Sequence, residues 1–159
     1  MAYVSLVNLK KKIVKNEDFS LTAECDVDQF DEEGGVAINF LEKPPQVPPQ
    51  EGDEIIFHFN PRPKPPSRII LNTFRKGQWG TEVILEGNSV RTQIFKKMFV
   101  LSLKVLSHDG GGSEFLVFLN GSLLTTYRCR LDITKTEYIG FSPALRVVAH
   151  KNFKEEAKL

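Results

Sequence analysis

Three polar side chains with different chemistry occupy alternate positions in one apolar run. The run I-I-F-H-F-N-P-R carries the imidazole of His58, the amide of Asn60 and the guanidinium of Arg62. Because side chains two residues apart in an extended strand project to the same side, we expect these three groups on one face. Phe57 and Phe59 then point the other way, which suits a hydrophobic core.

Two later strand-like stretches add Asn72, Trp79 and Glu82. If the stretches pair as antiparallel neighbours, an imidazole, two amides, a guanidinium, a carboxylate and an indole converge on one patch. Sugar hydroxyls need donors and acceptors in fixed positions, and the C–H face of a pyranose needs a flat apolar platform such as Trp. The sequence therefore predicts a site for a neutral polyol. A plain solvated sheet face and a core tryptophan are the competing interpretations, but the turn between Gly77 and Gly80 favours a surface position for the indole.

The elements that must position these residues are short strands. Period-two alternation dominates, strong helical patterns are absent, and turn residues separate the runs, which together predict an all-β antiparallel sandwich. A proline-rich surface loop at 43–53 and a turn at 61–67 interrupt the pattern, and the charged tail from 151 is expected to be frayed or to form a short helix. The expected strands are 3–7, 13–14, 19–25, 36–41, 54–60, 68–74, 81–85, 98–106, 115–119, 122–131, 139–141 and 145–149.

Length and composition predict one domain over 1–159, in which the expected strands span a core of about 3–150 and a charged tail follows at 151–159. The formal net charge of +1 argues against a nucleic-acid partner, which needs a concentrated basic excess. Cys25 and Cys129 are expected to be free buried thiols. Neither a signal peptide nor a membrane-spanning run is recognisable, so we expect a cytoplasmic protein without membrane insertion, and export by a leaderless route stays open.

The motif segments resemble a known family. H-F-N-P-R at 58–62, I-L-N-T at 70–73 and W-G-T-E at 79–82 are similar to the galectin carbohydrate-recognition motif. The resemblance implies a galectin-like, concanavalin-like jelly roll of two sheets with a β-galactoside groove on one concave face. It implies that His58, Asn60 and Arg62 bind the axial O4 of galactose, that Asn72 and Glu82 hold O6, and that Trp79 stacks under the ring.

The chain also departs from that motif. Galectins usually carry an arginine two residues after the motif glutamate, and this chain has Ile84 there, so we expect Arg62 to hold Glu82 instead. This change and the short proline-rich turn after Arg62 leave an altered glycan specificity as an alternative. A second alternative is a protein-interaction module, because the loop 61–66 contains a P-x-x-P sequence of the kind that adaptor domains bind. The segment 86–97 has no interpretation from the sequence.

Enzymatic and metal chemistry are not expected. Glycoside hydrolysis needs two carboxylates across the scissile bond, and Glu82 has no second carboxylate in the motif. The histidines His58, His108 and His150 are far apart in sequence and form no metal-binding pattern, so neither metal nor cofactor is predicted. The expected partners are β-galactoside glycans and glycoconjugates, and cross-linking of glycans by a single domain would require a homodimer.

Overall fold

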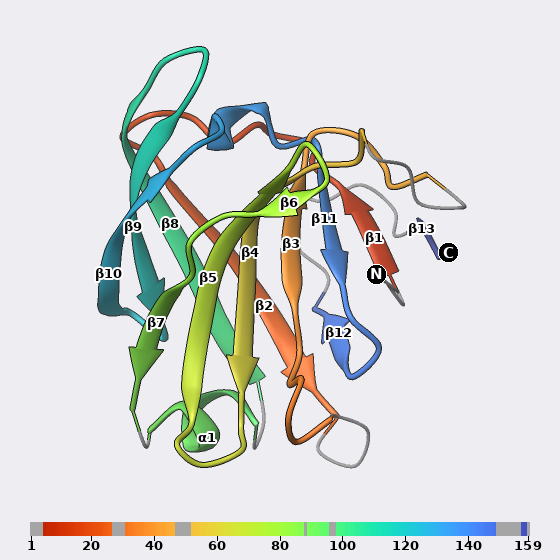
Figure 1. Ribbon diagram of the computed structural model, residues 1–159, viewed down its shortest axis with the longest axis vertical. Helices are drawn as coiled ribbons and strands as arrows, with labels where there is room; N and C mark the ends of the chain where they lie inside the picture. Colours follow the sequence, from red (N-terminus) through yellow and green to blue (C-terminus); the bar gives the residue numbers. More distant parts are fainter. Residues whose placement is uncertain are drawn as a thin grey trace.

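The computed structural model describes residues 5–26, 31–46, 52–87, 89–95 and 98–148, and the backbone of 157–158. Within these residues two antiparallel sheets pack face to face, as the alternation predicts (Figure 1). None of the helices in the described ranges has both the length and the apolar character that crossing a membrane requires.

The larger sheet has eight strands in the described chain and carries the motif segments. Its order is β13-β1-β11-β3-β4-β5-β6, and β7 pairs with β5 as well. The strands are β1 (Ser5–Asn8), β3 (Ile38–Leu41), β4 (Ile55–Arg62), β5 (Arg68–Arg75), β6 (Gln78–Trp79), β7 (Val83–Glu86), β11 (Tyr138–Phe141) and β13 (Ala157–Lys158).

The smaller sheet has five strands in the same residues, in the order β10-β9-β8-β2-β12. On β2, β8 and β9 every second side chain is buried, which is the pattern of a sheet with one face on the core and one in water. The strands are β2 (Asp18–Cys25), β8 (Met98–His108), β9 (Ser113–Leu119), β10 (Ser122–Cys129) and β12 (Leu145–Val147), and the short helices are α1 (Ser89–Ile94) and η1 (Ile133–Lys135).

Phenylalanines from both sheets meet in the core. Phe57 of β4 lies edge-on to Phe115 of β9, with ring centroids 5.1 Å apart, so the two sheets contact each other directly. Phe57 and Phe59 are fully buried, which confirms the predicted core face of β4. Cys25 and Cys129 are free and buried, as expected.

Two expectations about secondary structure are wrong, and one segment without an interpretation forms a helix. Residues 13–14 form no strand; Ile13 is buried, but the backbone bridge to Val105 forms at Lys15. The uninterpreted segment 86–97 contains helix α1, which buries Val90 and Ile94 one turn apart. The charged tail pairs with β1 through β13, because a strand edge accepts a partner through its backbone whatever the side chains are. The rest of the tail lies outside the described residues.

Candidate functional site

The outer face of β4 carries the three polar residues of the motif. His58, Asn60 and Arg62 alternate with the buried phenylalanines, as the spacing predicts. The face differs from a solvated one, since His58 is 9% and Asn60 4% exposed. Buried polar groups need hydrogen-bond partners, so each side chain here must be held by specific neighbours.

Strand pairing brings the next two residues to the same face. In the β4–β5 pair His58 lies opposite Asn72, and in the β5–β6 pair Phe74 lies opposite Trp79. The Trp79 indole contacts the His58 ring, with centroids 4.7 Å apart and planes at 52°, and packs edge-on against Phe74 at 5.1 Å. Trp79 keeps 43% of its surface exposed, which is consistent with a platform for a ligand and not with a core residue.

Glu82 joins the patch from the connection between β6 and β7. It lies immediately before Val83, which pairs with Leu71, the residue next to Asn72. Its side chain is exposed. In the described chain Arg62 and Glu82 form no ion pair, and the expectation that Arg62 holds Glu82 is therefore wrong. Arg62 Nε instead donates to Asn60 Oδ1 at 2.9 Å.

The two asparagines are anchored by backbone groups. Asn60 Nδ2 donates to Gly34 O at 2.9 Å and to Val36 O at 2.8 Å, which uses both of its N–H donors. Asn72 Nδ2 donates to Gly80 O at 3.0 Å, and Asn72 Oδ1 accepts from the Thr73 N–H at 2.8 Å. Asn72 therefore keeps one N–H donor and one lone pair for a ligand.

The loop that holds Asn60 requires glycine at one position. Gly35 has a φ of 66°, and a Cβ there would lie 1.9 Å from Pro61 O. Only glycine permits both this backbone conformation and this close approach to β4. The Gly-Gly turn in the sequence is thus the support for the Asn60 amide.

His58 is held as a neutral ring. Its pKa is lowered to about 4, first because burial penalises the charged form and second because the Arg62 guanidinium repels an added proton. Its Nδ1 lies 2.5 Å from Asn39 Oδ1, an oxygen that can only accept. The proton of the neutral ring therefore sits on Nδ1, and Nε2 is a hydrogen-bond acceptor.

Two neighbours of the patch were not predicted from the sequence. Asn39 is fully buried in the middle of β3, and the signal was a polar residue in the otherwise apolar run V-A-I-N-F-L. Beside the Trp79–Phe74 contact lies a small apolar cluster of the outer face, comprising Leu6, Leu41, Ile55, Phe74 and Tyr138. This cluster fixes the position of Phe74 and hence one edge of the indole.

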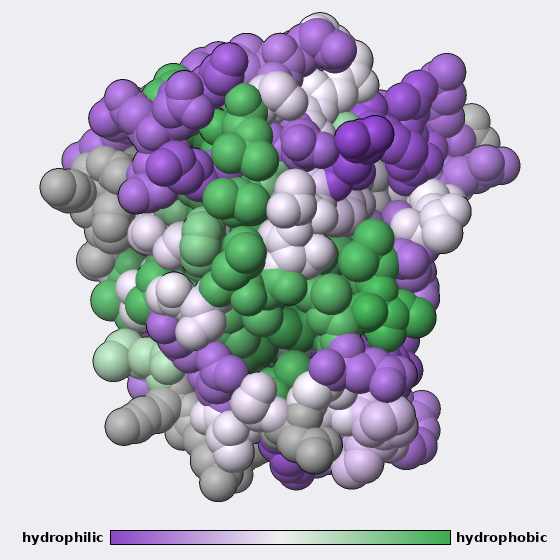
Figure 2. All heavy atoms as spheres, turned by 90° about the vertical axis from the view of Figure 1, so that its left-hand side faces the viewer, coloured by the Kyte–Doolittle hydropathy of each residue, from purple (hydrophilic) through white to green (hydrophobic). Residues whose placement is uncertain are grey.

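Beyond Glu82 the face becomes apolar. Ile84 lies opposite Ile70, which lies opposite Asn60, and Ile84 is 51% exposed. Figure 2 shows hydrophobic residues gathering over the side of the molecule where β7 and β10 lie. Exposed members on these strands include Val83, Ile84 and Leu123.

All six predicted residues thus come from three neighbouring strands and the turn between them, on one face. They offer donors, acceptors and an aromatic plane, which is the inventory of a polyol site. In the described ranges no group of three or more His, Cys, Asp or Glu side chains is placed to hold a metal ion.

A sequence profile of the galactoside-binding lectin family matches residues 7–149. The chain belongs to this family. As a galectin, it has the two-sheet jelly roll that the motif implied. It is 31% identical to galectin-8 of Rattus norvegicus over 87 residues, which are 55% of this chain and 25% of galectin-8. The match thus spans about a quarter of the length of that relative.

Solved galectins share the fold over the whole chain. Sheep galectin-11 in complex with glycerol superposes with a TM-score of 0.63 at 16% identity, covering 100% of this chain and 99% of that one. A doubly substituted variant of human galectin-16 gives a TM-score of 0.65 at 17% identity, with 99% and 97% covered. Identities this low support the fold alone.

Proposed function

We propose that this single galectin domain, residues 1–159, is a non-enzymatic lectin that binds β-galactosides on the outer face of the larger sheet. The observation that carries the proposal is the convergence of six side chains on that face: His58, Asn60, Arg62, Asn72, Trp79 and Glu82. Family membership supports the ligand class, and the hydrogen-bonding capacity of the patch supports the binding mode.

His58 and Arg62 would select the axial O4 of galactose. The neutral His58 ring offers Nε2 as an acceptor, and Arg62 offers guanidinium N–H groups that only donate. A hydroxyl between them can donate to His58 and accept from Arg62, so both groups are satisfied by one oxygen. A sugar with an equatorial O4 would leave the buried His58 acceptor and the partly buried Arg62 donors unpaired, at a cost of roughly 1–3 kcal/mol each.

Trp79, Asn72 and Glu82 would hold the rest of the ring. The exposed face of the indole suits the C–H surface of the pyranose and contributes about 1 kcal/mol. The unused N–H and lone pair of Asn72, and the exposed Glu82 carboxylate, suit the O6 hydroxyl. The sum predicts weak binding of a single disaccharide, on the order of 0.1–1 mM, with avidity gained from multivalent glycoconjugates.

The test compares two disaccharides that differ in the orientation of O4 on the terminal sugar. Lactose ends in galactose and cellobiose in glucose. Because Trp79 is the single tryptophan of the chain, its fluorescence reports directly on the patch. We expect lactose to change the emission and to give a calorimetric isotherm, and cellobiose to do neither. Equal responses to the two sugars, or no response to lactose, would contradict the proposal.

Ile84 favours a second candidate, a galectin with altered preference beyond the galactose. Ile84 is 51% exposed and lies opposite Ile70, and the resemblance to galectins implies that this position borders a second sugar. An aliphatic group offers no hydrogen bonds to sugar hydroxyls. A glycan array that shows binding to galactosides with other substituents but weak binding to lactosamine would support this version.

Assembly, location and the proline-rich loop complete the proposal. Cross-linking of glycans would require a homodimer, which an elution volume measured against concentration would detect. We expect the protein in the cytoplasm, and secretion to the extracellular space stays open. The P-x-x-P loop is an alternative interaction site, in which Lys64 is paired with Glu33 and Pro63 O accepts from Arg91. Adaptor-domain capture that is unaffected by Pro66→Ala would exclude it.

A further inference from the structure

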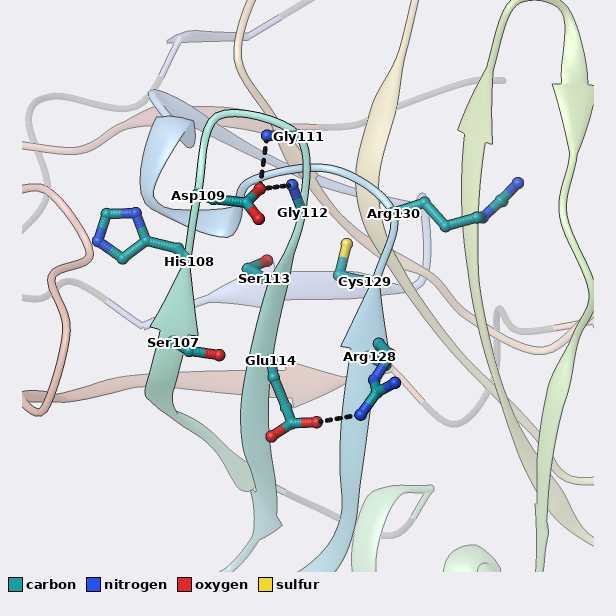
Figure 3. Close-up of a pocket in the computed structure, with 10 residues that line it drawn as sticks. All are labelled: Ser107, His108, Asp109, Gly111, Gly112, Ser113, Glu114, Arg128, Cys129 and Arg130. Carbon is teal, nitrogen blue, oxygen red and sulfur yellow. Dashed lines mark hydrogen bonds and ion pairs between the residues drawn. The ribbon is translucent and has the colours of Figure 1, made fainter.

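Arg130 reaches from the end of the smaller sheet to the motif strands. It follows β10 directly, and Figure 3 shows its side chain extending away from the other labelled residues of the pocket. Its Nη2 donates to Thr73 O, on β5, at 2.9 Å. The same carbonyl accepts the Gly80 N–H at 3.1 Å. The Thr73 carbonyl oxygen therefore accepts hydrogen bonds from both the Arg130 guanidinium and the N–H of Gly80, the residue that follows Trp79.

The guanidinium also fills the space beside Gly80. A Cβ on Gly80 would lie 1.8 Å from Arg130 Nη2 and 2.2 Å from its Cζ. The carbonyl of Gly80 accepts from Asn72 Nδ2 at 3.0 Å. Gly80 therefore contacts both the Asn72 amide and the Arg130 guanidinium, and it is bonded in the chain to the residue before it, Trp79.

The backbone of Arg130 is tied to the same region. Arg75 Nη1, from the end of β5, donates to Arg130 O at 3.4 Å. Within the described ranges Arg130 forms no ion pair, and its guanidinium donates a hydrogen bond to the Thr73 carbonyl instead. Arg128, two residues earlier on β10, differs: its side chain is 87% exposed and pairs with Glu114 at 3.3 Å (Figure 3).

We propose that Arg130 is a positioning residue for the sugar site. Its guanidinium holds the chain at Gly80 in place, and so fixes the plane of the neighbouring Trp79 indole and the direction of the Asn72 amide. Arg130 does not contact the ligand itself. The inference rests on the proposed function for its effect on binding. Its effect on Trp79 can be measured without any sugar.

The first test compares Arg130→Ala with Arg128→Ala, a matched loss of one arginine two residues earlier in the chain. In Arg130→Ala we expect acrylamide quenching of Trp79 to rise and lactose affinity to fall about fivefold, which is less than the loss of a charged hydrogen bond to the sugar itself because Arg130 acts only through its neighbours. Arg128→Ala should match the wild type in both readouts. Arg130→Lys keeps a cation without the planar fork and should lie between Arg130→Ala and the wild type in both.

The second test displaces the guanidinium without removing it. Gly80→Ala places a methyl group where the guanidinium lies, so lactose affinity should fall about as far as in Arg130→Ala. In the Arg130→Ala background the methyl group has nothing to displace, and Gly80→Ala should then change affinity less than about twofold. Fully additive effects would show that the two residues act separately and would overturn the proposal.

The outcomes separate this inference from the proposed function. Unchanged Trp79 quenching in Arg130→Ala overturns the positioning role, whatever the sugar data show. Altered quenching in a protein that never binds lactose supports the positioning role and contradicts the proposed function. Urea unfolding checks each fold. If Arg130→Ala is unfolded, the comparison of Arg130→Lys with the wild type decides: equal quenching would overturn the proposal.

Discussion

The outer faces of the two sheets use similar polar residues but bury them to different degrees. On β4, His58 and Asn60 are less than a tenth exposed, although they face away from the core. On β2 and β8 the outward residues Ser20 and Ser102 remain partly exposed and bond to each other through their hydroxyls at 2.8 Å. β4, β2 and β8 each have a neighbouring strand on both sides, so position in the sheet does not explain the difference.

The difference lies in what covers each face. Asn60 is held by the Gly34 and Val36 carbonyls, and the His58 ring lies against Trp79. These neighbours fix the direction of each donor and acceptor before any ligand arrives, which lowers the ordering cost of binding. Polar side chains alone are thus typical of any sheet face. Polar side chains that are buried and anchored on an outer face indicate a site.

The largest expected effect is on lactose affinity when one cationic residue is removed from the outer face of each sheet in turn. Arg62→Ala should reduce lactose affinity at least about tenfold, because a hydrogen bond to a charged group contributes roughly 1.5–3 kcal/mol. Lys104→Ala, on the outward face of β8, removes a cation from the smaller sheet and should leave affinity unchanged. Calorimetric titration of both variants checks this, and equal losses would remove the distinction between the faces.

Next in size is the effect on stability. Asn60→Ala removes two donors from backbone carbonyls and an acceptor from Arg62, so unfolding should cost about 1–3 kcal/mol less. Ser20→Ala removes a hydroxyl that water can replace and should change stability by about 0.5 kcal/mol or less. Urea denaturation measures both. A Ser20→Ala loss as large as that of Asn60→Ala would contradict the account.

The pH dependence sharpens the comparison at His58. The pKa of His58 is about 4 in the folded chain, and the ordinary value of 6.5 applies to the unfolded chain. At a pH between these two values the unfolded chain therefore binds more protons than the folded chain. Stability contributed by the neutral ring is present above pH 6.5 and is lost as pH falls toward 4, by up to about 3 kcal/mol. The difference in unfolding free energy between wild type and His58→Gln should shrink over this window. A difference independent of pH would contradict the burial of a neutral ring.

The smallest expected effect concerns the edge of the patch. Ile84→Arg adds donors beside the exposed Glu82 and should raise affinity for lactosamine about threefold, with little change for methyl β-galactoside. The two titrations together locate Ile84 relative to the first and second sugars. An equal gain for the monosaccharide would place the new arginine against galactose instead.

Local pattern was enough to predict much of this fold. Alternation in β4 identified which face holds Phe57 and which holds His58, and the proline and glycine turns separated the strands. The helix α1 was missed because six residues are too few for a helical period to stand out. The tail strand β13 was missed because backbone pairing leaves no side-chain pattern.

The anchors of the site needed the three-dimensional structure. Asn39 holds His58 from a neighbouring strand, and Arg130 reaches Thr73 from a residue 57 positions away in sequence. Such contacts depend on how the sheets pack, which no local spacing encodes. The sequence predicted the residues suited to a sugar, whereas the groups that orient them became visible only in the fold.

The central claim is that one anchored face of the larger sheet holds the galactoside. A ¹H–¹⁵N correlation spectrum recorded through a lactose titration tests it most directly, because the Trp79 indole N–H and the Asn60 and Asn72 side-chain amides give separate signals. The account predicts that these signals shift together with one affinity, while the amides of β2, β8 and β9 stay in place. Shifts confined to the smaller sheet, or binding that leaves the Trp79 signal unmoved, would contradict it.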